Sequence, residues 1–257
     1  MYRLVGKPEA LRREGLFAVE GRLLLPRLLA SRYRTHSILC SEAGYESLAD
    51  CTGAHPGVRL LVAPADIISD IAGYKFHRGC LALGYRRAPE PLEHTLPHAR
   101  PGKGPGREPI LILEGVSNPD NIGGIFRSAH AFGARGVLVG PDCGDPLYRK
   151  AIRTSMGATL QVPWTALAAW PGDLRAVQQR GYRLVALTPD GSAPPLREIV
   201  AGSEAPIAFV LGSEGHGLSE AAMAHADAVA RIPMRAADAD SLNVNAAASI
   251  ALYEATH

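Results

Sequence analysis

Three stretches of this sequence combine amide, carboxylate, guanidinium and glycine residues in patterns that could support chemistry. The first, residues 114–127, has the sequence EGVSNPDNIGGIFR, and the second, residues 211–219, has the sequence LGSEGHGLS. The third, residues 231–253, has the sequence RIPMRAADADSLNVNAAASIALY. Each begins where an apolar run ends, so we expect its polar side chains to follow a strand.

The first stretch pairs two adjacent glycines with a later arginine. Exposed backbone N–H groups near Gly123 and Gly124, at a predicted helix start, suit an anion or a polar substrate. Arg127 follows Asn121 by six residues, less than two helical turns, so both side chains could face one pocket. The alternative interpretation is that Arg127 is a surface residue and that the glycines only permit close packing.

The second stretch is rich in glycine but lacks a nucleotide-binding fingerprint. Gly212, Gly215 and Gly217 are spaced G-x-x-G-x-G, whereas a dinucleotide site requires G-x-G-x-x-G after the first strand. No Gly-Lys-Ser/Thr follows, so a P-loop is excluded. The pattern leaves a backbone-lined slot for a different adenosine-bearing cofactor.

The third stretch predicts a loop followed by a helix. Ser241 suits the N-cap position because its hydroxyl can accept a bond from an unpaired backbone N–H. Residues 246–248 are alanines, which favour a helix and let another surface approach closely. Asn243 and Asn245 lie where a core helix would have apolar residues, and Asn is a poor mid-helix residue. A capped C-terminal helix with two solvated amides is the alternative.

Strands and helices are predicted to alternate throughout residues 109–257. The apolar runs are typical of strands that are buried on both faces. The alternation predicts an α/β fold with a mostly parallel sheet and helices on both faces. Ligands in such sheets bind at the carboxyl ends of strands, so the three stretches should meet there. The expected strands are residues 110–113, 136–139, 182–187, 207–211 and 228–232, and the expected helices are residues 121–132, 147–156 and 174–180.

The sequence of residues 1–87 predicts a smaller α/β unit. Residues 88–108 are basic and rich in proline and glycine, which predicts a linker. The basic group formed by Lys75, Phe76 and Arg78 could stack on a base and contact phosphate. A solvated turn with one anchoring Phe is the alternative. The expected elements of the smaller unit are helices at residues 16–30 and 64–72 and strands at residues 37–40, 58–62 and 79–85.

Composition and charge narrow the class of protein. The 257-residue chain is 47% hydrophobic and 20% charged, as in globular proteins, and no apolar run approaches the length of a membrane span. No signal peptide is visible, the four cysteines form no CxxC pair, and the histidines lack metal-ligand spacing. We therefore expect a cytoplasmic protein with reduced thiols and no metal. Residues 1–108 contain 16 Lys and Arg and 11 Asp and Glu, hence a net charge of +5, so a polyanion should dock there.

Together the three stretches resemble the three ordered motifs of the SpoU (TrmH-like) branch of SPOUT RNA methyltransferases. The matching runs are NPDNIGGIFRSAHAFGARGVLV, FVLGSEGHGLS and IPM…SLNVNAAASIALYE, with RTSMGA between the first two motifs. The run GYKFHRGCLAL resembles the substrate-binding domain that some members have before the catalytic domain. The resemblance implies a C-terminal trefoil knot, a homodimer with sites near its interface, S-adenosylmethionine as cofactor, and RNA (rRNA or tRNA) as substrate.

The resemblance also implies roles for individual residues in methyl transfer to a ribose 2′-hydroxyl. Arg127 would either accept the hydroxyl proton or, as a permanently charged guanidinium, hold phosphate and stabilise alkoxide character. The loop at residues 235–240 is longer and more acidic than the family pattern, and Asn245 replaces a common serine. The implied catalytic residues are Asn121, Arg127, Glu214, Ser241 and Asn243; the cofactor-binding residues are Leu211, Gly212, Gly215, Ile232, Met234 and Leu242; and the RNA-binding residues are Lys75, Phe76, Arg78 and Arg153.

Three other functions stay open on the sequence alone. A SPOUT enzyme that methylates a base is opposed by the SLN run at residues 241–243, which is typical of the ribose branch. A catalytically silent RNA-binding module is opposed by the filled catalytic positions. A Rossmann-type small-molecule enzyme is opposed by the glycine spacing.

Overall fold

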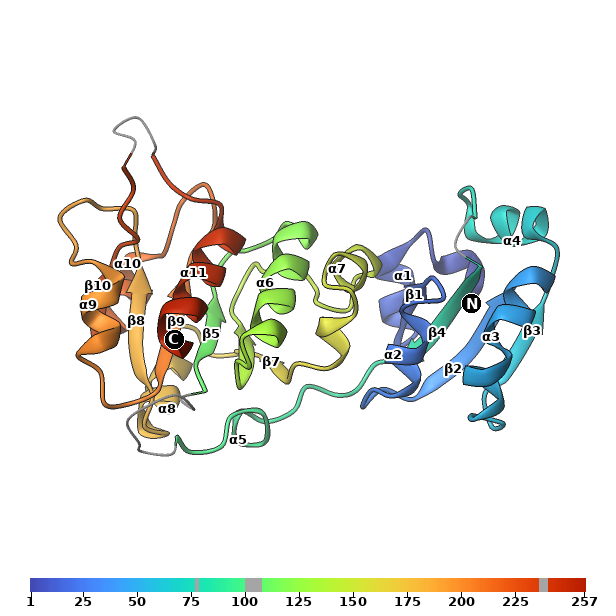
Figure 1. Ribbon diagram of the computed structural model, residues 1–257, viewed down its shortest axis with the longest axis horizontal. Helices are drawn as coiled ribbons and strands as arrows, with labels where there is room; N and C mark the ends of the chain where they lie inside the picture. Colours follow the sequence, from blue (N-terminus) through green and yellow to red (C-terminus); the bar gives the residue numbers. More distant parts are fainter. Residues whose placement is uncertain (77–78, 100–107, 236–239) are drawn as a thin grey trace. The chain divides into compact units, whose positions relative to one another are not determined.

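The chain forms two compact units, each with its own sheet (Figure 1). The computed structural model describes residues 1–76, 79–99, 108–235 and 240–257. The larger unit comprises Pro89–Asp145 and Val162–His257, and the smaller unit comprises Met1–Ala88 and Pro146–Gln161. This division differs from the expected domains at residues 1–87 and 109–257 in two respects, because residues 146–161 return to the smaller unit and residues 89–99, expected as part of the linker at residues 88–108, belong to the larger unit.

The sheet of the larger unit contains six strands, all paired in parallel, in the order β10-β8-β9-β5-β6-β7. The strands are β5 (Ile110–Leu113), β6 (Gly136–Val139), β7 (Trp164–Ala166), β8 (Arg183–Leu187), β9 (Ile207–Leu211) and β10 (Ala228–Ala230). Every residue of β5, β6 and β9 is buried, as strands covered on both faces require. The prediction of a mostly parallel sheet is confirmed.

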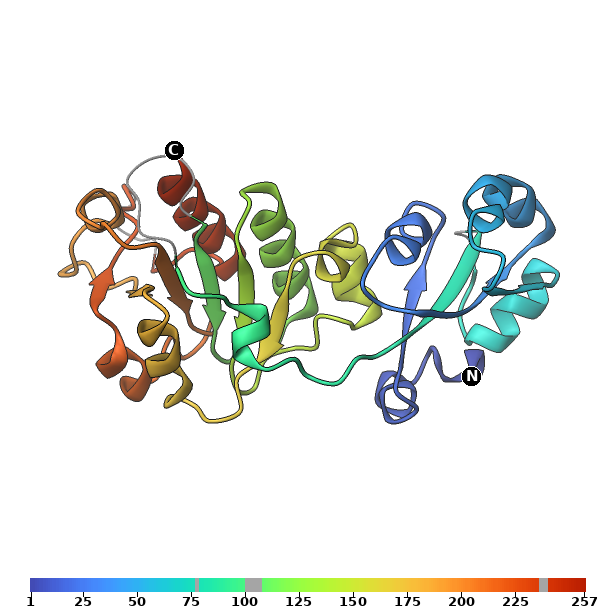
Figure 2. The ribbon, with the colours of Figure 1, turned by 90° about the horizontal axis from the view of Figure 1, so that it is seen from below.

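Helices cover both faces of this sheet, and for the helices that connect two of its strands the strand order explains the face. They are α6 (Pro119–Ala131), α8 (Asp173–Gln179), α9 (Leu196–Ala201), α10 (Glu220–His225) and α11 (Val244–Thr256). Right-handed crossovers place helices that lead toward β7 on one face and helices that lead toward β10 on the other. Figure 2 accordingly shows α6, α9 and α11 along one face and α8 and α10 along the other.

Alternate side chains of the strands fill a core on each face. Ile110 and Ile112 pack with Leu184 and Val210 on the face of α8 and α10. Burying each side chain of this size contributes about 1.5–3 kcal/mol. The packing holds β5 and β9 in register, so Leu113 and Leu211 lie opposite each other at the carboxyl edge of the sheet.

The linker prediction needs one correction, because residues 92–95 form a helix. This helix, α5 (Leu92–Thr95), contacts β7. Prolines were expected to interrupt any helix here. Pro91, however, precedes the first helical residue, where its missing N–H leaves no intrahelical bond unmade.

The smaller unit contains a four-stranded sheet in the order β1-β4-β2-β3, in which β4 is antiparallel to β1 and β2 and β2 is parallel to β3. Its strands are β1 (Leu16–Glu20), β2 (Thr35–Cys40), β3 (Arg59–Val62) and β4 (Cys80–Tyr85). Its helices are η1 (Tyr2–Leu4), α1 (Pro8–Arg13), α2 (Leu25–Leu29), α3 (Glu42–Gly53), α4 (Ala65–Ala72), α7 (Arg149–Thr154) and η2 (Ala158–Leu160).

The helix predicted at residues 16–30 is wrong in its first part, which is strand β1. All five residues of β1 are buried, because α1, α2 and α7 pack against the strand. A strand buried on both faces is a continuous apolar run, which periodicity alone does not distinguish from a buried helix.

Residues 146–161 belong to the smaller unit because α7 supplies a partner for a buried carboxylate of β1. Glu20 is 5% exposed, and its Oε2 lies 2.9 Å from Nη1 of Arg149. The Arg149 guanidinium also lies 4.3 Å from the centre of the Tyr74 ring. A buried carboxylate is strongly destabilising without such a cation.

The structure corrects the expected cap of the C-terminal helix: Asn243, and not Ser241, caps α11. The Oδ1 atom of Asn243 accepts bonds from the backbone N–H groups of Asn245 (3.0 Å) and Ala246 (3.4 Å). The N-cap position favours asparagine. The N-cap role therefore explains why residue 243 is an asparagine, although an apolar residue was expected there.

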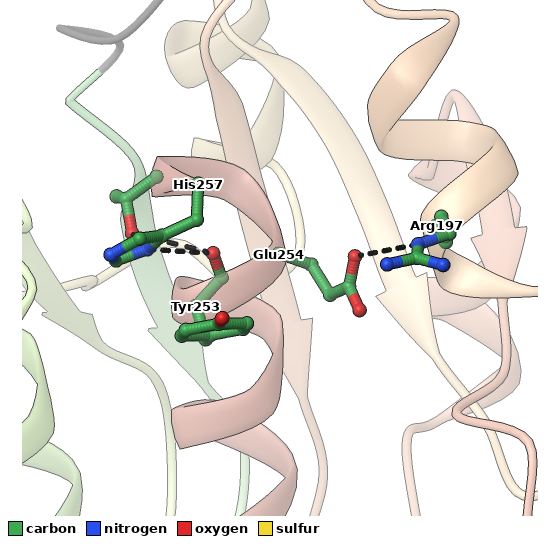
Figure 3. Close-up of polar contacts among 5 residues, drawn as sticks. Arg197, Tyr253, Glu254 and His257 are labelled. Carbon is green, nitrogen blue, oxygen red and sulfur yellow. Dashed lines mark hydrogen bonds and ion pairs between the residues drawn. The ribbon is translucent and has the colours of Figure 1, made fainter.

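The other end of α11 carries polar contacts at the surface. Figure 3 shows Arg197 of α9 beside Glu254 of α11, with Nε and Oε2 3.5 Å apart. The Arg197 side chain is 84% exposed, so this pair contributes at most about 1 kcal/mol. The Tyr253 ring stacks on His257, with ring centres 4.5 Å apart. Tyr253 is 52% exposed, so an aromatic surface remains at this end of α11.

Two features are absent from the described residues. No helix among them is long and apolar enough to cross a membrane. No group of three or more His, Cys, Asp or Glu side chains among them is arranged to hold a metal ion.

Candidate functional site

The loops after β5, β9 and β10 lie together at the carboxyl edge of the larger sheet, as the sequence predicted. Neighbouring parallel strands end at the same edge, and the backbone N–H of Glu114 donates to the Leu211 carbonyl at 2.9 Å. At the start of α6, the Asn118 side chain accepts the Asp120 N–H at 2.9 Å and Pro119 takes the first helical position. These bonds fix the direction in which α6 leaves the edge.

Three polar residues from the three loops form a hydrogen-bonded cluster, the Asn121–Glu214–Asn243 cluster. The Nδ2 group of Asn243 donates to Oδ1 of Asn121 at 3.0 Å and to Oε1 of Glu214 at 2.5 Å. Because Oδ1 of Asn243 accepts the two backbone N–H groups that begin α11, the network fixes which amide atom is the donor. Among the described residues, Oε2 of Glu214 has no hydrogen-bond partner.

The loop between Gly212 and Ser219 is a tight hairpin that only glycine permits. A Cβ atom added at Gly212 would lie 2.1 Å from the carbonyl carbon of Gly217, and Gly217 has a left-handed φ of +68°. Ser213 and Gly217 exchange two backbone bonds of 3.2 and 3.0 Å. Glu214 therefore lies at the turn of a hairpin held by its own backbone.

Sequence reasoning missed the carboxylate that joins the first loop to this hairpin. Glu114 is half-buried and accepts three bonds: from Trp170 Nε1 at 2.6 Å, from Ser219 N–H at 2.9 Å and from Ser219 Oγ at 2.7 Å. Ser219 also caps α10 through Ala222 N–H. The available signal was an acidic residue directly after a buried strand. Its partners, Trp170 and Ser219, follow it by 56 and 105 residues, so the neighbouring sequence does not indicate them.

Close contact between α6 and α11 explains Gly124 and Asn245. A Cβ atom at Gly124 would lie 2.5 Å from the Asn245 side chain. One turn later, the hydroxyls of Ser128 and Ser249 are 2.7 Å apart. The packing interpretation of the glycines therefore holds at Gly124.

Two adjoining cavities open at this edge. The first, the Ile232 cavity, has a volume of about 540 Å³, and the second, the Asn121 cavity, has a volume of about 580 Å³. The side chains and backbone of residues 213–218 line both. All six residues expected to bind a cofactor line the Ile232 cavity: Leu211, Gly212, Gly215, Ile232, Met234 and Leu242.

The expected catalytic residues divide into those at the cavities and one apart from them. Ser241 lines the Ile232 cavity, Asn121 lines the Asn121 cavity, and Glu214 lines both. Arg127 is exposed and lines neither cavity. It makes no hydrogen bond or ion pair within the described part of the chain. Six residues along a helix turn the side chain by about 240°, so Arg127 lies on a different face of α6 from Asn121.

Of the expected RNA-binding residues, Lys75, Phe76 and Arg153 lie in the smaller unit, and Arg78 lies outside the described residues. Lys75 is exposed, and Arg153 lines a cavity of about 520 Å³ in that unit together with Arg22 and Phe76. The Phe76 ring is 6% exposed and belongs to the core cluster of the unit, so it lacks the open face that stacking on a base requires.

A cysteine close to the first loop is not poised as a nucleophile. Burial raises the pKa of the Cys143 thiol from 9.0 to about 11, although backbone bonds from Val116 and Gly115 act in the opposite direction. The thiol is therefore protonated near neutral pH, and the thiolate is the nucleophilic form. All four cysteines are free, and it is the raised pKa of Cys143 that opposes covalent thiol chemistry at this edge.

The chain is similar to known RNA methyltransferases. Residues 108–253 match the family described as the SpoU rRNA Methylase family. An uncharacterized tRNA/rRNA methyltransferase of Mycobacterium bovis is 38% identical over 251 residues, 97% of this chain and 84% of the relative. The 23S rRNA (guanosine-2′-O-)-methyltransferase RlmB of Ralstonia nicotianae is 31% identical over 200 residues, 77% of each chain. The structure of an AdoMet-bound rRNA methyltransferase from Sinorhizobium meliloti has a TM-score of 0.81 at 28% identity, covering 99% of this chain and 92% of that one.

Proposed function

Because this chain belongs to the SpoU rRNA methylase family, we propose that it transfers a methyl group from S-adenosylmethionine to a ribose 2′-hydroxyl of a structured RNA. The family and the similar structures support S-adenosylmethionine-dependent methylation of RNA as the activity. The ribose target is our further step, and one observation carries it. Glu214, hydrogen-bonded to Asn243, faces both cavities, so one carboxylate reaches both the cofactor space and the substrate space.

The Ile232 cavity fits the cofactor in size and in lining. Its volume of about 540 Å³ is in the range of sites for small molecules. Gly212 and Gly215 line the cavity, a Cβ at Gly215 would meet open space, and Ile232, Met234 and Leu242 provide apolar walls. When bound, S-adenosylmethionine supplies a methyl group already activated by a sulfonium charge. The protein then has to orient and activate only the hydroxyl.

The Asn121–Glu214–Asn243 cluster supplies that activation in our proposal. A hydroxyl is a poor nucleophile until its proton is removed or its developing charge is stabilised. Asn243 holds one oxygen of Glu214, which leaves Oε2 to accept the hydrogen of the ribose hydroxyl. Asn121 orients Asn243, and Ser241 positions the ribose or the methionine end of the cofactor.

Arg127 acts by charge in this proposal. Arg127 lies apart from both cavities, so in our proposal its exposed guanidinium binds the RNA phosphate next to the reacting ribose, and its charge stabilises alkoxide character in the transition state once this RNA is in place. A guanidinium stays protonated in proteins, so we assign it no role as the proton acceptor.

We also propose a homodimer, a knotted C-terminal segment and a cytoplasmic location, all of which the family resemblance implied. An exposed aromatic surface supports the homodimer, since Tyr253 lies edge-on to Phe132 with ring centres 6.3 Å apart. The smaller unit would select the RNA through Lys75, Arg78 and Arg153. Cell fractionation that recovers the protein in a membrane pellet would contradict the location.

The proposed activity can be tested by the chemical position of the transferred methyl group. The purified protein is incubated with radiolabelled S-adenosylmethionine and with rRNA or tRNA from cells that lack it, and the RNA is hydrolysed in alkali. A 2′-O-methyl group blocks cleavage at its own nucleotide, so the label should appear in dinucleotides. Label in mononucleotides would indicate base methylation, and RNA binding without transfer would indicate a silent binding module.

A further inference from the structure

A recess at one edge of the smaller sheet gathers basic and aromatic side chains that are far apart in the sequence. We call it the Arg34–Tyr85 recess. It has a volume of about 600 Å³ and lies at the amino ends of β2 and β3, beside the last residue of β4. The ionisable side chains that line it include Arg32, Arg34, His36 and His55. None of the described residues that line it has a carboxylate.

The backbone of two adjacent strands holds the cluster together. The N–H of Tyr85 donates to the Arg34 carbonyl at 2.9 Å. The Arg34 guanidinium lies 4.1 Å from the centre of the Tyr85 ring, and the His36 ring lies 5.3 Å from it. Nδ1 of His36 is 2.7 Å from the hydroxyl of Ser37. These contacts bring the cation and the rings together without a ligand.

The members of the cluster differ in accessibility. Tyr33 is 5% exposed and packs edge-on against Phe17, with ring centres 5.2 Å apart, so it forms a rigid wall. Arg34 is exposed, and within the described chain no carboxylate pairs with it. Arg34 thus lines the recess while its guanidinium lies over the Tyr85 ring, and we infer that the other face of the guanidinium is accessible from the recess.

We propose that the Arg34–Tyr85 recess binds one unpaired nucleotide of RNA, with its phosphate on the guanidinium groups and its base on the exposed face of Arg34. A guanidinium binds phosphate through two N–H groups and also stacks on planar groups. A recess that is lined by arginine side chains and by no carboxylate attracts a polyanion. The proposal rests on the proposed function, because that function makes RNA the substrate.

This recess is a different site from the one that the sequence suggested. Lys75 and Phe76 precede the first residue of β4, whereas Tyr85 is its last residue, so the two lie at opposite ends of the strand. Phe76 is buried, and the structure assembles an alternative aromatic and basic surface from β2, β4 and the loop that contains His55.

The test compares single substitutions in the full-length protein. The probes are a fluorescent single-stranded RNA oligonucleotide, a blunt RNA duplex of equal length and a poly-glutamate peptide, with affinity measured by anisotropy at several salt concentrations. The variants are Arg34→Ala, Arg34→Lys and Tyr85→Leu. Arg175→Ala is the control, because Arg175 is an exposed arginine of α8 and its loss removes the same charge. Calorimetry with S-adenosylmethionine shows whether the larger unit is intact.

Arg34→Ala should weaken binding of the single strand about tenfold, as loss of one stacked base does, and should reduce the salt slope by about one. Arg34→Lys should recover part of the affinity, and cofactor binding should be unchanged in every variant. Equal affinities of Arg34→Ala and Arg175→Ala for the single strand would overturn the recess and leave the proposed function standing. A loss confined to the peptide would overturn it as well. Absence of RNA binding by the natural chain would instead overturn the proposed function.

Discussion

Replacing Glu114 should loosen the hairpin that lines both cavities. The carboxylate accepts the Trp170 indole N–H and both the N–H and the hydroxyl of Ser219. Ser219 ends the hairpin on the side opposite β9, so Glu114 holds its far end against the first loop. Glu114→Ala removes the acceptor of all three bonds, and Glu114→Gln keeps the shape but turns an N–H donor toward one of the three donors.

The expected loss follows from what each donor can do without the carboxylate. Ser219 is exposed, so water can replace its bonds, whereas the half-buried Trp170 N–H loses its acceptor. A stranded polar group of this kind costs about 1–3 kcal/mol. Glu114→Ala should therefore lower the free energy of unfolding by about 2 kcal/mol. If half of that free energy, about 1 kcal/mol, opposes cofactor binding, the Kd for S-adenosylmethionine should rise about fivefold.

Urea unfolding and calorimetric titration with S-adenosylmethionine measure the two effects. Glu46→Ala is the matched control, because Glu46 is an exposed carboxylate on α3 of the smaller unit. Its unfolding free energy should change by no more than about 0.5 kcal/mol. If Glu114→Ala unfolds and binds the cofactor as Glu46→Ala does, the carboxylate does not position the hairpin and the reasoning from its three bonds is refuted.

Three further predictions concern charge, assembly and pH. Arg127→Ala should slow single-turnover methylation about 100- to 1000-fold with cofactor affinity unchanged. Arg127→Lys should keep a small residual rate. Full activity of Arg127→Ala would exclude Arg127 from the methyl-transfer step. Tyr253→Glu should give a monomer by light scattering, and a fully active monomer of the natural chain would contradict the homodimer. Burial raises the pKa of Cys143 to about 11 and of Cys80 to about 12 from 9.0, so unfolded thiols ionise above pH 9 while folded ones stay protonated. The free energy of unfolding should fall from pH 9 to 12, less so in Cys143→Ala, and a flat profile would contradict this.

The larger sheet and its edge could be predicted from the sequence because local physics determines both. Strands β5, β6 and β9 are buried on both faces, so continuous apolar runs marked their bounds. Parallel strands end at one edge, so the three polar stretches had to converge there. The family resemblance is confirmed by the match over residues 108–253.

Contacts between distant segments could not be predicted in the same way. The pairing of Arg149 with Glu20 moves residues 146–161 into the smaller unit, and nothing near either residue in the sequence announces it. The same holds for Glu114 with Trp170 and for the Arg34–Tyr85 recess. At Phe76 the sequence suggested a contact that the structure does not offer. Its basic neighbours suggested an exposed ring, but the ring is buried in the apolar core of the smaller unit.

A local ambiguity explains the remaining error at α11. Both serine and asparagine suit an N-cap, and the sequence places Ser241 and Asn243 two residues apart. Asn243 can cap the helix with its oxygen and bind Asn121 and Glu214 with its nitrogen, which a serine hydroxyl cannot do with two separate atoms.

The central claim is that the Asn121–Glu214–Asn243 cluster directs a methyl group to a ribose hydroxyl of cellular RNA. It is tested most directly by mapping ribose methylation across rRNA and tRNA in cells that lack this protein and in the same cells supplied with the natural chain or with Glu214→Gln. The account predicts that a defined ribose methyl group disappears, returns with the natural chain and stays absent with Glu214→Gln at equal protein level. Identical maps with and without the protein, or full restoration by Glu214→Gln, would contradict it.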